Sequence, residues 1–285
     1  MDSFFKSYDI ANEVYKKNEP GIKHSRKSIK GISIDDMRIN SIDNPYHKKV
    51  GRYILIDPAS PIFEDDYALE NVLIKYIRQL VKNKVNGKKK INVLIVGLGN
   101  KDYTPDSLGP KVVDKIEVNY HLKKDKIEKK EIKTFISAFA PGVMASTGFE
   151  SSNMIKAIVE KESIDVVIAV DALATRTIKR LNRVIQITDT GISPGSGIGN
   201  YRKALDEENL KIPVIAIGVA TVIDTAAIVI ETLNNMKLDN NKQHEIADKV
   251  ISNIDERIIM STKDIDFEIK NIAKLIAESI NLAFN

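Results

Sequence analysis

The sequence contains no cysteine and no tryptophan, and only four of its 285 residues are histidines. Without thiols, the chain forms no disulfide, thiolate nucleophile, zinc knuckle or iron–sulfur cluster. The histidines, His24, His47, His121 and His244, lie in polar or charged stretches, so we expect no metal site built on them. Catalysis therefore depends on carboxylates, hydroxyls, lysines or backbone amides. The lack of cysteine is typical of a reducing cytoplasm, where we expect the protein to act.

Long apolar runs and an export signal are also missing. No run of about eighteen uncharged apolar residues occurs, so we expect no membrane-spanning helix and no membrane partner. Residues 1–31 carry lysines throughout and no apolar stretch of the length of a signal peptide, and we interpret them as a loosely held arm. The net charge of +4 arises from lysines spread among many acids, so nucleic acid is not an expected partner.

Apolar runs separated by segments of helical length indicate the fold class. The runs suit strands buried on both faces of a sheet, and the segments between them have helical spacing. Strands are expected at residues 52–57, 91–96, 134–138, 166–170, 184–187 and 214–219, and helices at 67–85, 108–118, 149–161, 220–233 and 264–284. The pattern predicts an α/β fold with a doubly wound, mostly parallel sheet flanked by helices on both faces.

Two aspartates follow strand ends, which is where ligands bind in an open parallel sheet. Asp106 lies at or just before a helix start, and Asp171 directly follows the run at 166–170. Asp106 is either a helix N-cap or part of a carboxylate pair, and Asp171 is a turn residue, a salt-bridge partner of Arg176 or the other member of the pair. In a pair, Asp106 would be the base that activates water, and a protonated Asp171 would polarise a carbonyl.

Glycine-rich and hydroxyl-bearing segments follow other strand ends and are candidate walls of a cleft. The candidate residues are Gly97, Gly99, Asn100, Ser146, Thr147, Asp189, Gly191, Gly195 and Gly197. The turn at residues 97–100 lacks the third glycine of a dinucleotide-binding fingerprint, because Asp102 stands there. The segment at 189–200 either offers backbone amides to a peptide or is a flexible surface turn. Asp224 falls inside an expected buried helix and is interpreted as an internally hydrogen-bonded polar group.

Six segments, taken in order, carry a resemblance to a known family. They are residues 104–110 (TPDSLGP), 139–148 (FAPGVMASTG), 170–174 (VDALA), 186–191 (QITDTG), 194–200 (PGSGIGN) and 212–219 (IPVIAIGV). Together they resemble the germination proteases of endospore-forming bacteria. The resemblance implies an atypical aspartic endopeptidase of the spore cytoplasm that degrades small acid-soluble spore proteins during germination, is made as a zymogen and assembles as a tetramer. The two essential aspartates of the family fall on Asp106 and Asp171.

The same resemblance implies an amino-terminal propeptide. Family zymogens are cut between an acidic and an apolar residue that is followed by alanine and a nearby glutamate, as in the substrate site. Asp9-Ile10-Ala11-Asn12-Glu13 is similar, so we expect self-processing between Asp9 and Ile10, with residues 1–9 as propeptide and 10–285 as a single α/β peptidase domain. The alternative is that residues 1–31 are a disordered tail. The stretch between Leu233 and Ser261 is short for the family.

Two other functions remain open from the sequence. The family shares its fold with the hydrogenase maturation endopeptidases, which hold nickel through two carboxylates and a histidine. This chain offers no evident equivalent of that histidine, so we expect neither a metal nor another cofactor, and a nickel-sensing maturation endopeptidase is the first alternative. The second is a non-enzymatic nucleotide-binding module, although the chain lacks a phosphate-gripping lysine motif.

Overall fold

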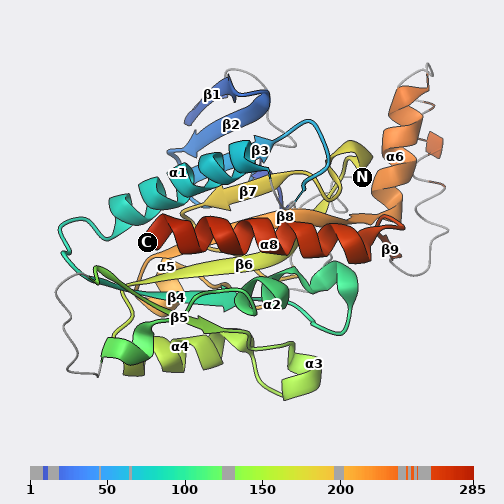
Figure 1. The fold of residues 1–285 in the computed structure, drawn as a ribbon. Coiled ribbons are helices and arrows are strands. Elements are labelled where there is room, and N and C mark those ends of the chain that lie inside the picture. The colour runs from blue at the N-terminus through green and yellow to red at the C-terminus, as the bar shows by residue number, and fades with distance from the viewer. Residues whose placement is uncertain are drawn as a thin grey trace.

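The computed structural model describes residues 9–11, 19–44, 46–63, 66–123, 132–195, 202–236, 242, 245–246, 249 and 258–285. One nine-stranded sheet runs through these residues in the order β1-β2-β3-β7-β8-β6-β4-β5, with β9 paired to β8 (Figure 1). The strands are β1 (Ile22–Ile29), β2 (Ile32–Ile39), β3 (Gly51–Asp57), β4 (Ile91–Gly97), β5 (Thr134–Phe139), β6 (Val166–Thr175), β7 (Ile185–Thr188), β8 (Val214–Asp224) and β9 (Ile259–Met260). The helices are α1 (Tyr67–Lys84), α2 (Leu108–Val113), α3 (Met144–Thr147), α4 (Ser151–Glu162), α5 (Glu207–Leu210), α6 (Thr225–Asn235) and α8 (Ile265–Phe284).

The predicted α/β fold is confirmed, and the sheet divides into a parallel and an antiparallel part. Strands β5, β4, β6 and β8 are parallel neighbours. Beyond them, β7, β3, β2 and β1 each run antiparallel to the preceding neighbour. Parallel neighbouring strands need a crossover connection, which is usually a helix. In the part of the chain that the structure describes, helices pack against β5, β4, β6 and β8 in this way. The sheet is therefore mixed, with the parallel strands on one side.

The interpretation of residues 22–31 as a loosely held arm is wrong, because β1 and β2 form a hairpin. Lys30 and Gly31, with φ of 49° and 83°, make a two-residue turn in which both central residues are left-handed, as in a type I′ turn. Strand β1 is largely exposed and polar, so it lacks the apolar run that reveals a buried strand. Its pairing is supported by Asp35 of β2, which lies 3.1 Å from His24 Nε2 and 3.5 Å from Arg26 Nε.

Helices cover both faces of the parallel strands. Helices α1, α2 and α8 pack on one face, and α4 and α5 on the other (Figure 1). Along β6 the side chains alternate: Val166, Ile168 and Val170 join the cluster under α8, whereas Val167 and Ala169 join the cluster under α4. Asp171 continues this alternation and faces the α4 side of the sheet. No helix among the described residues is long and apolar enough to cross a membrane.

Strands β6 and β8 extend five residues beyond their predicted ends, and this changes the positions of two aspartates. Strand β6 continues to Thr175, so Asp171 lies within a strand, opposite Gly218, and not at its tip. Strand β8 runs to Asp224, so the helix expected from residue 220 begins at 225, because the β-branched residues at 221–223 favour the strand. Asp224 is then the N-cap of α6 and accepts a hydrogen bond from Ala226 N at 2.8 Å. Helix α2 ends at Val113, five residues earlier than expected.

Candidate active site

Asp106 is held by the turn that follows β4. It ends a 3-10 helix, η2 (Thr104–Asp106), and its Oδ2 accepts a hydrogen bond from Asn100 N at 2.8 Å. Gly99 adopts φ of 110°, and a side chain there would place a Cβ 2.0 Å from the Asp106 carbonyl oxygen, so glycine is required at this approach. The N-cap of α2 is Ser107, so the interpretation of Asp106 as an N-cap is wrong. Its carboxylate instead accepts the hydrogen bond from Asn100 within the preceding turn.

Asp171 projects from β6 into the cavity that Asp106 also lines. This cavity has a volume of about 340 Å³. The side chain of Asp171 is buried, at 5% exposure, and its Oδ1 accepts a hydrogen bond from Ala172 N at 2.9 Å. The two aspartates, 65 positions apart in the sequence, therefore meet in one hollow on the α4 side of the sheet.

The surroundings of the two carboxyl groups separate their affinities for a proton. Burial raises the pKa of Asp106 to about 6, against the opposing effect of the hydrogen bond from Asn100. Burial also raises the pKa of Asp171 well above its ordinary value, and the charges of Asp106 and Asp9 raise it further. Burial therefore favours the protonated form of both groups, and the neighbouring charges of Asp106 and Asp9 favour it further at Asp171.

A third acidic residue, Asp9, reaches the same cavity from the amino-terminal segment. Its Oδ2 accepts a hydrogen bond from Ala174 N at 2.9 Å, and Asp9 lines the cavity together with the aspartate pair. The next two residues are buried, with Ile10 1% and Ala11 0% exposed. Ile10 joins an apolar cluster with Leu55, Leu173, Val184 and Ala220, and Ala11 joins one with Met37, Ile39 and Tyr53. The segment predicted to be cut therefore lies on the sheet beside the aspartate pair.

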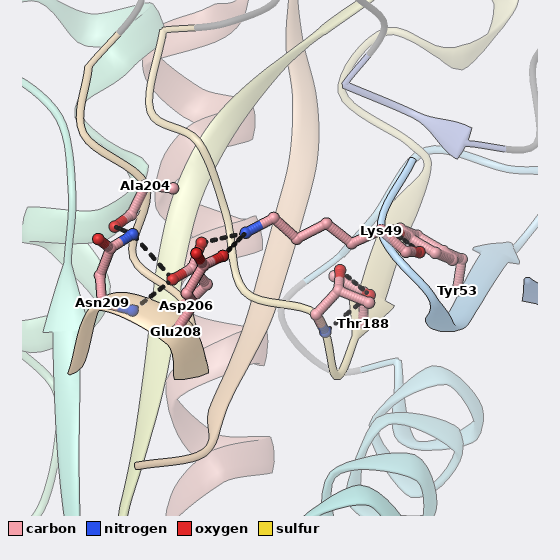
Figure 2. A network of polar contacts seen from close by, with 8 residues as sticks. Lys49, Tyr53, Thr188, Ala204, Asp206, Glu208 and Asn209 are labelled. Atoms are coloured by element: carbon pink, nitrogen blue, oxygen red, sulfur yellow. Dashed lines mark hydrogen bonds and ion pairs between the residues drawn. The ribbon is translucent and has the colours of Figure 1, made fainter. Parts of the chain in front are cut away.

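A second cavity, of about 310 Å³, adjoins Asp9 and extends over β7. Lys49 and Asp206 both line it, and Figure 2 shows their ion pair, in which Lys49 reaches from the loop before β3 to Asp206 at the start of α5. Although burial of Asp206 works in the opposite direction, hydrogen bonds from Lys49 and Asn209 hold its pKa below the ordinary value. The Lys49 carbonyl in turn accepts a hydrogen bond from Tyr53 Oη at 2.9 Å.

The predicted cleft residues divide between the cavities and the framework. Gly99, Asn100 and Gly195 line the cavity of the aspartate pair, and Gly191 lines the second cavity. In contrast, Gly97 packs against α2, since a Cβ there would lie 2.2 Å from the Gly109 carbonyl oxygen.

Other predicted residues have local structural contacts. Asp189 accepts a hydrogen bond from Arg52 N at 2.7 Å. The hydroxyls of Ser146 and Thr147 donate to the Val143 carbonyl at 2.9 and 3.2 Å, and Val143 itself lines the cavity. Gly197 lies outside the described residues.

Gln186 is a site residue that the sequence interpretation missed. Its side-chain amide contacts the amino-terminal segment twice: Nε2 donates to the Asp9 carbonyl at 3.0 Å, and Oε1 accepts from Ala11 N at 2.8 Å. The signal in the sequence is a long polar side chain within the otherwise apolar run at 184–187. Within the described part of the chain, no group of three or more histidine, cysteine, aspartate or glutamate side chains has an arrangement that would hold a metal ion.

Comparison with known proteins gives consistent results. The family model for germination proteases matches residues 5–237. The germination protease of Caldanaerobacter subterraneus is 37% identical over 302 aligned positions, which cover 96% of this chain and 91% of that protein. That of Clostridium perfringens is 34% identical, with 99% of this chain and 94% of the relative covered. The germination protease of Bacillus subtilis is 46% identical over 66% of this chain and 52% of that protein.

A solved structure, a [NiFe] hydrogenase maturation protease from Thermococcus kodakarensis, aligns with a TM-score of 0.34 and 16% identity. The alignment covers 70% of this chain and 98% of that structure. A similarity at this level does not bear on function.

Proposed function

Because the chain belongs to the germination protease family, we propose that it is an atypical aspartic endopeptidase that hydrolyses small acid-soluble spore proteins with Asp106 and Asp171. The observation that carries the proposal is the cavity that the two carboxyl groups share, where burial raises both pKa values and the charges of Asp106 and Asp9 raise that of Asp171 further. Two carboxyl groups whose proton affinities differ are suited to joint base and acid catalysis.

The proton transfers of the proposed reaction take place between the two side chains, a water molecule and the peptide. Ionised Asp106 takes a proton from the water as its oxygen attacks the carbonyl carbon, and Asp171 gives its proton to the carbonyl oxygen. When the tetrahedral intermediate collapses, the carbon–nitrogen bond breaks and the proton held by Asp106 passes to the leaving amine. The proton on the former carbonyl oxygen returns to Asp171, so both carboxyl groups regain their starting states.

The same proposal includes regulation by the amino-terminal segment. Residues 1–9 form the propeptide of an inactive precursor, and cleavage between Asp9 and Ile10 leaves residues 10–285 as one peptidase domain. The support for this step is the buried position of Ile10 and the place of Asp9 at the cavity of the aspartate pair. On the basis of the family resemblance, we propose that the enzyme acts as a homotetramer in the spore cytoplasm, without a metal or other cofactor.

The substrate assignment is tested by incubating the processed protein with a recombinant small acid-soluble spore protein. We expect one main cut, between an acidic residue and an apolar residue followed by alanine, because this is the sequence of the segment that lies at the cavity. Mass spectrometry of the fragments identifies the bond. A parallel reaction with a metal chelator should proceed at the same rate. Cleavage at unrelated sequences, or none at all, would contradict the assignment.

The pH dependence follows from the two raised pKa values. We expect kcat/KM to rise through pH 6, where Asp106 ionises and becomes a base, and to fall at higher pH, where Asp171 loses its proton. Initial rates on a fixed peptide across pH 4 to 9 measure both limbs. A rate that increases as the pH falls below 5 would exclude Asp106 as the base.

The free energy of unfolding should fall over the pH range in which kcat/KM rises. Because the pKa of Asp106 is higher in the folded chain than its ordinary value of 3.8, the unfolded chain loses this proton first as the pH rises. Ionisation therefore costs the folded state about 3 kcal/mol between pH 4 and pH 6, with no further loss from this group above that range. Urea unfolding of the full chain and of Asp106→Asn at matched pH separates this contribution from those of other groups.

A further inference from the structure

We infer that Gln186 is a catalytic residue of the proposed peptidase, whose side-chain amide binds the peptide on both sides of the bond to be cut and donates a hydrogen bond to the carbonyl under attack. The inference rests on the proposed function, in which the bond between Asp9 and Ile10 is the one hydrolysed. The carbonyl of that bond belongs to Asp9, and Gln186 Nε2 lies 3.0 Å from its oxygen.

The orientation of the amide is fixed by its two partners. A backbone N–H can only donate and a backbone carbonyl can only accept, so Oε1 faces Ala11 N at 2.8 Å and Nε2 faces the Asp9 oxygen. A primary amide presents one acceptor and two donors in one plane, and here it pairs with the chain as a neighbouring strand would. This contact uses only backbone atoms of residues 9 and 11, so it is available to any substrate in the same position.

The register of the sheet sets the position of Gln186 relative to Asp171. Asp171, Gly218 and Gln186 are directly paired across β6, β8 and β7, so their side chains share one face. Adjacent strands lie about 4.8 Å apart, which places the Gln186 backbone about 10 Å from that of Asp171. Gly218 stands between them, and the side chain of Leu173 lies over it, since a Cβ on Gly218 would be 2.4 Å from Leu173 Cδ1. The amino-terminal segment packs on Leu173 through Ile10, and its Asp9 lines the cavity of Asp171 and is hydrogen-bonded to Gln186.

The side-chain contacts of residues 9 and 10 hold the segment in one register. Ile10 is buried among apolar side chains of β3, β6 and β8, and the Asp9 carboxylate accepts a hydrogen bond from Ala174 N. Gln186 itself is 6% exposed, so its hydrogen bonds are shielded from water. A donor aimed at the carbonyl oxygen in such a site stabilises the negative charge that develops there during attack, and loss of one such donor costs about 10²–10³-fold in rate.

Two substitutions separate the donor from the acceptor. Gln186→Glu keeps an oxygen for Ala11 N but loses the donor to the Asp9 carbonyl, and Gln186→Met has nearly the same length and neither function. Self-processing of the full chain, followed by mass spectrometry, should slow about 100-fold in Gln186→Glu and at least as much in Gln186→Met. Gln79→Glu, the same change at an exposed position of α1 on the opposite face of the sheet, is the matched control and should process normally.

Hydrogen exchange of the Ala11 amide gives a readout that does not depend on cleavage. It is measured by NMR on chains that also carry Asp171→Asn, so that the segment stays intact. The Ala11 amide should remain protected in Gln186→Glu and lose protection in Gln186→Met. If the Ala11 amide stays protected in both variants, the proposed contact is wrong. If Gln186→Glu is processed at a rate within threefold of that of the unchanged chain, the role assigned to Nε2 is wrong.

The two proposals fail differently. If the unchanged chain is never processed, the proposed function fails and the catalytic part of Gln186 fails with it, while Ala11 protection still decides whether the amide binds the segment. If the unchanged chain is processed and both Gln186 variants keep its rate, the proposed function stands and the inference is wrong.

Discussion

Replacing Asp171 with asparagine should abolish cleavage, lowering kcat/KM by at least about 10³-fold, and should raise the midpoint of thermal unfolding at neutral pH. Activity is lost because the amide has no proton of suitable acidity to give to the carbonyl oxygen. Stability increases because Asp171 is buried and close to the charges of Asp106 and Asp9, so the folded chain must take up a proton there or bury another charge. Peptide hydrolysis and a thermal melt on one preparation measure both effects.

The combination of an inactive and more stable variant distinguishes a catalytic carboxyl group from a structural one. A structural aspartate stabilises the fold through its partners, so its loss lowers the unfolding midpoint. Asp106→Asn should behave like Asp171→Asn, since asparagine still accepts the hydrogen bond from Asn100 N. Asp102→Asn, an exposed position in the same turn, is the control and should change neither property. Residual hydrolysis by Asp171→Asn at a tenth of the normal rate would contradict the proposed role.

Much of this site was predictable because strand ends carry a strong sequence signal. The apolar runs before Asp106 and Asp171 identify parallel strands, and the topology of such sheets brings their carboxyl ends together. The sequence therefore predicts that two residues far apart in the chain share one hollow, and the structure places both at one cavity. What the runs did not reveal is that β6 continues past Asp171, because the strand there is Ala-Leu-Ala-Thr and contains a register shift after Leu173.

The features that the sequence did not reveal depend on long-range contacts of polar residues. The hairpin of β1 and β2 has an exposed polar strand whose stability comes from backbone pairing and from contacts with Asp35. Gln186 gains its partners from Asp9 and Ala11, more than 170 positions away, and no local pattern reports such a contact. The burial of Ile10 was unpredictable for the same reason, because a single isoleucine in a polar segment produces no amphipathic pattern.

Replacing Ile10 with lysine should have two opposite effects, which follow from its place beside the aspartate pair. The side chain is buried among Leu55, Leu173, Val184 and Ala220, and its burial is worth about 2 kcal/mol. A charged side chain is not accommodated in this cluster, so the segment should leave the cleft. Self-processing after Asp9 should then slow by about 30-fold or more, as followed by amino-terminal sequencing of samples held at mildly acidic pH.

The same variant should cleave an added peptide faster than the unprocessed chain does. In the unchanged chain the segment is tethered to the site, so its effective concentration exceeds that of any added substrate and the cleft stays occupied. Releasing it opens the cleft without any cut, and we expect a gain of about tenfold or more in the initial rate on a peptide that copies residues 5–14. Ile10→Val, which fits the same cluster, should process normally and gain nothing. If Ile10→Lys is processed at the normal rate, the segment is not cut where it lies in the structure, and if it is unprocessed yet no more active on the peptide, the segment does not block the site.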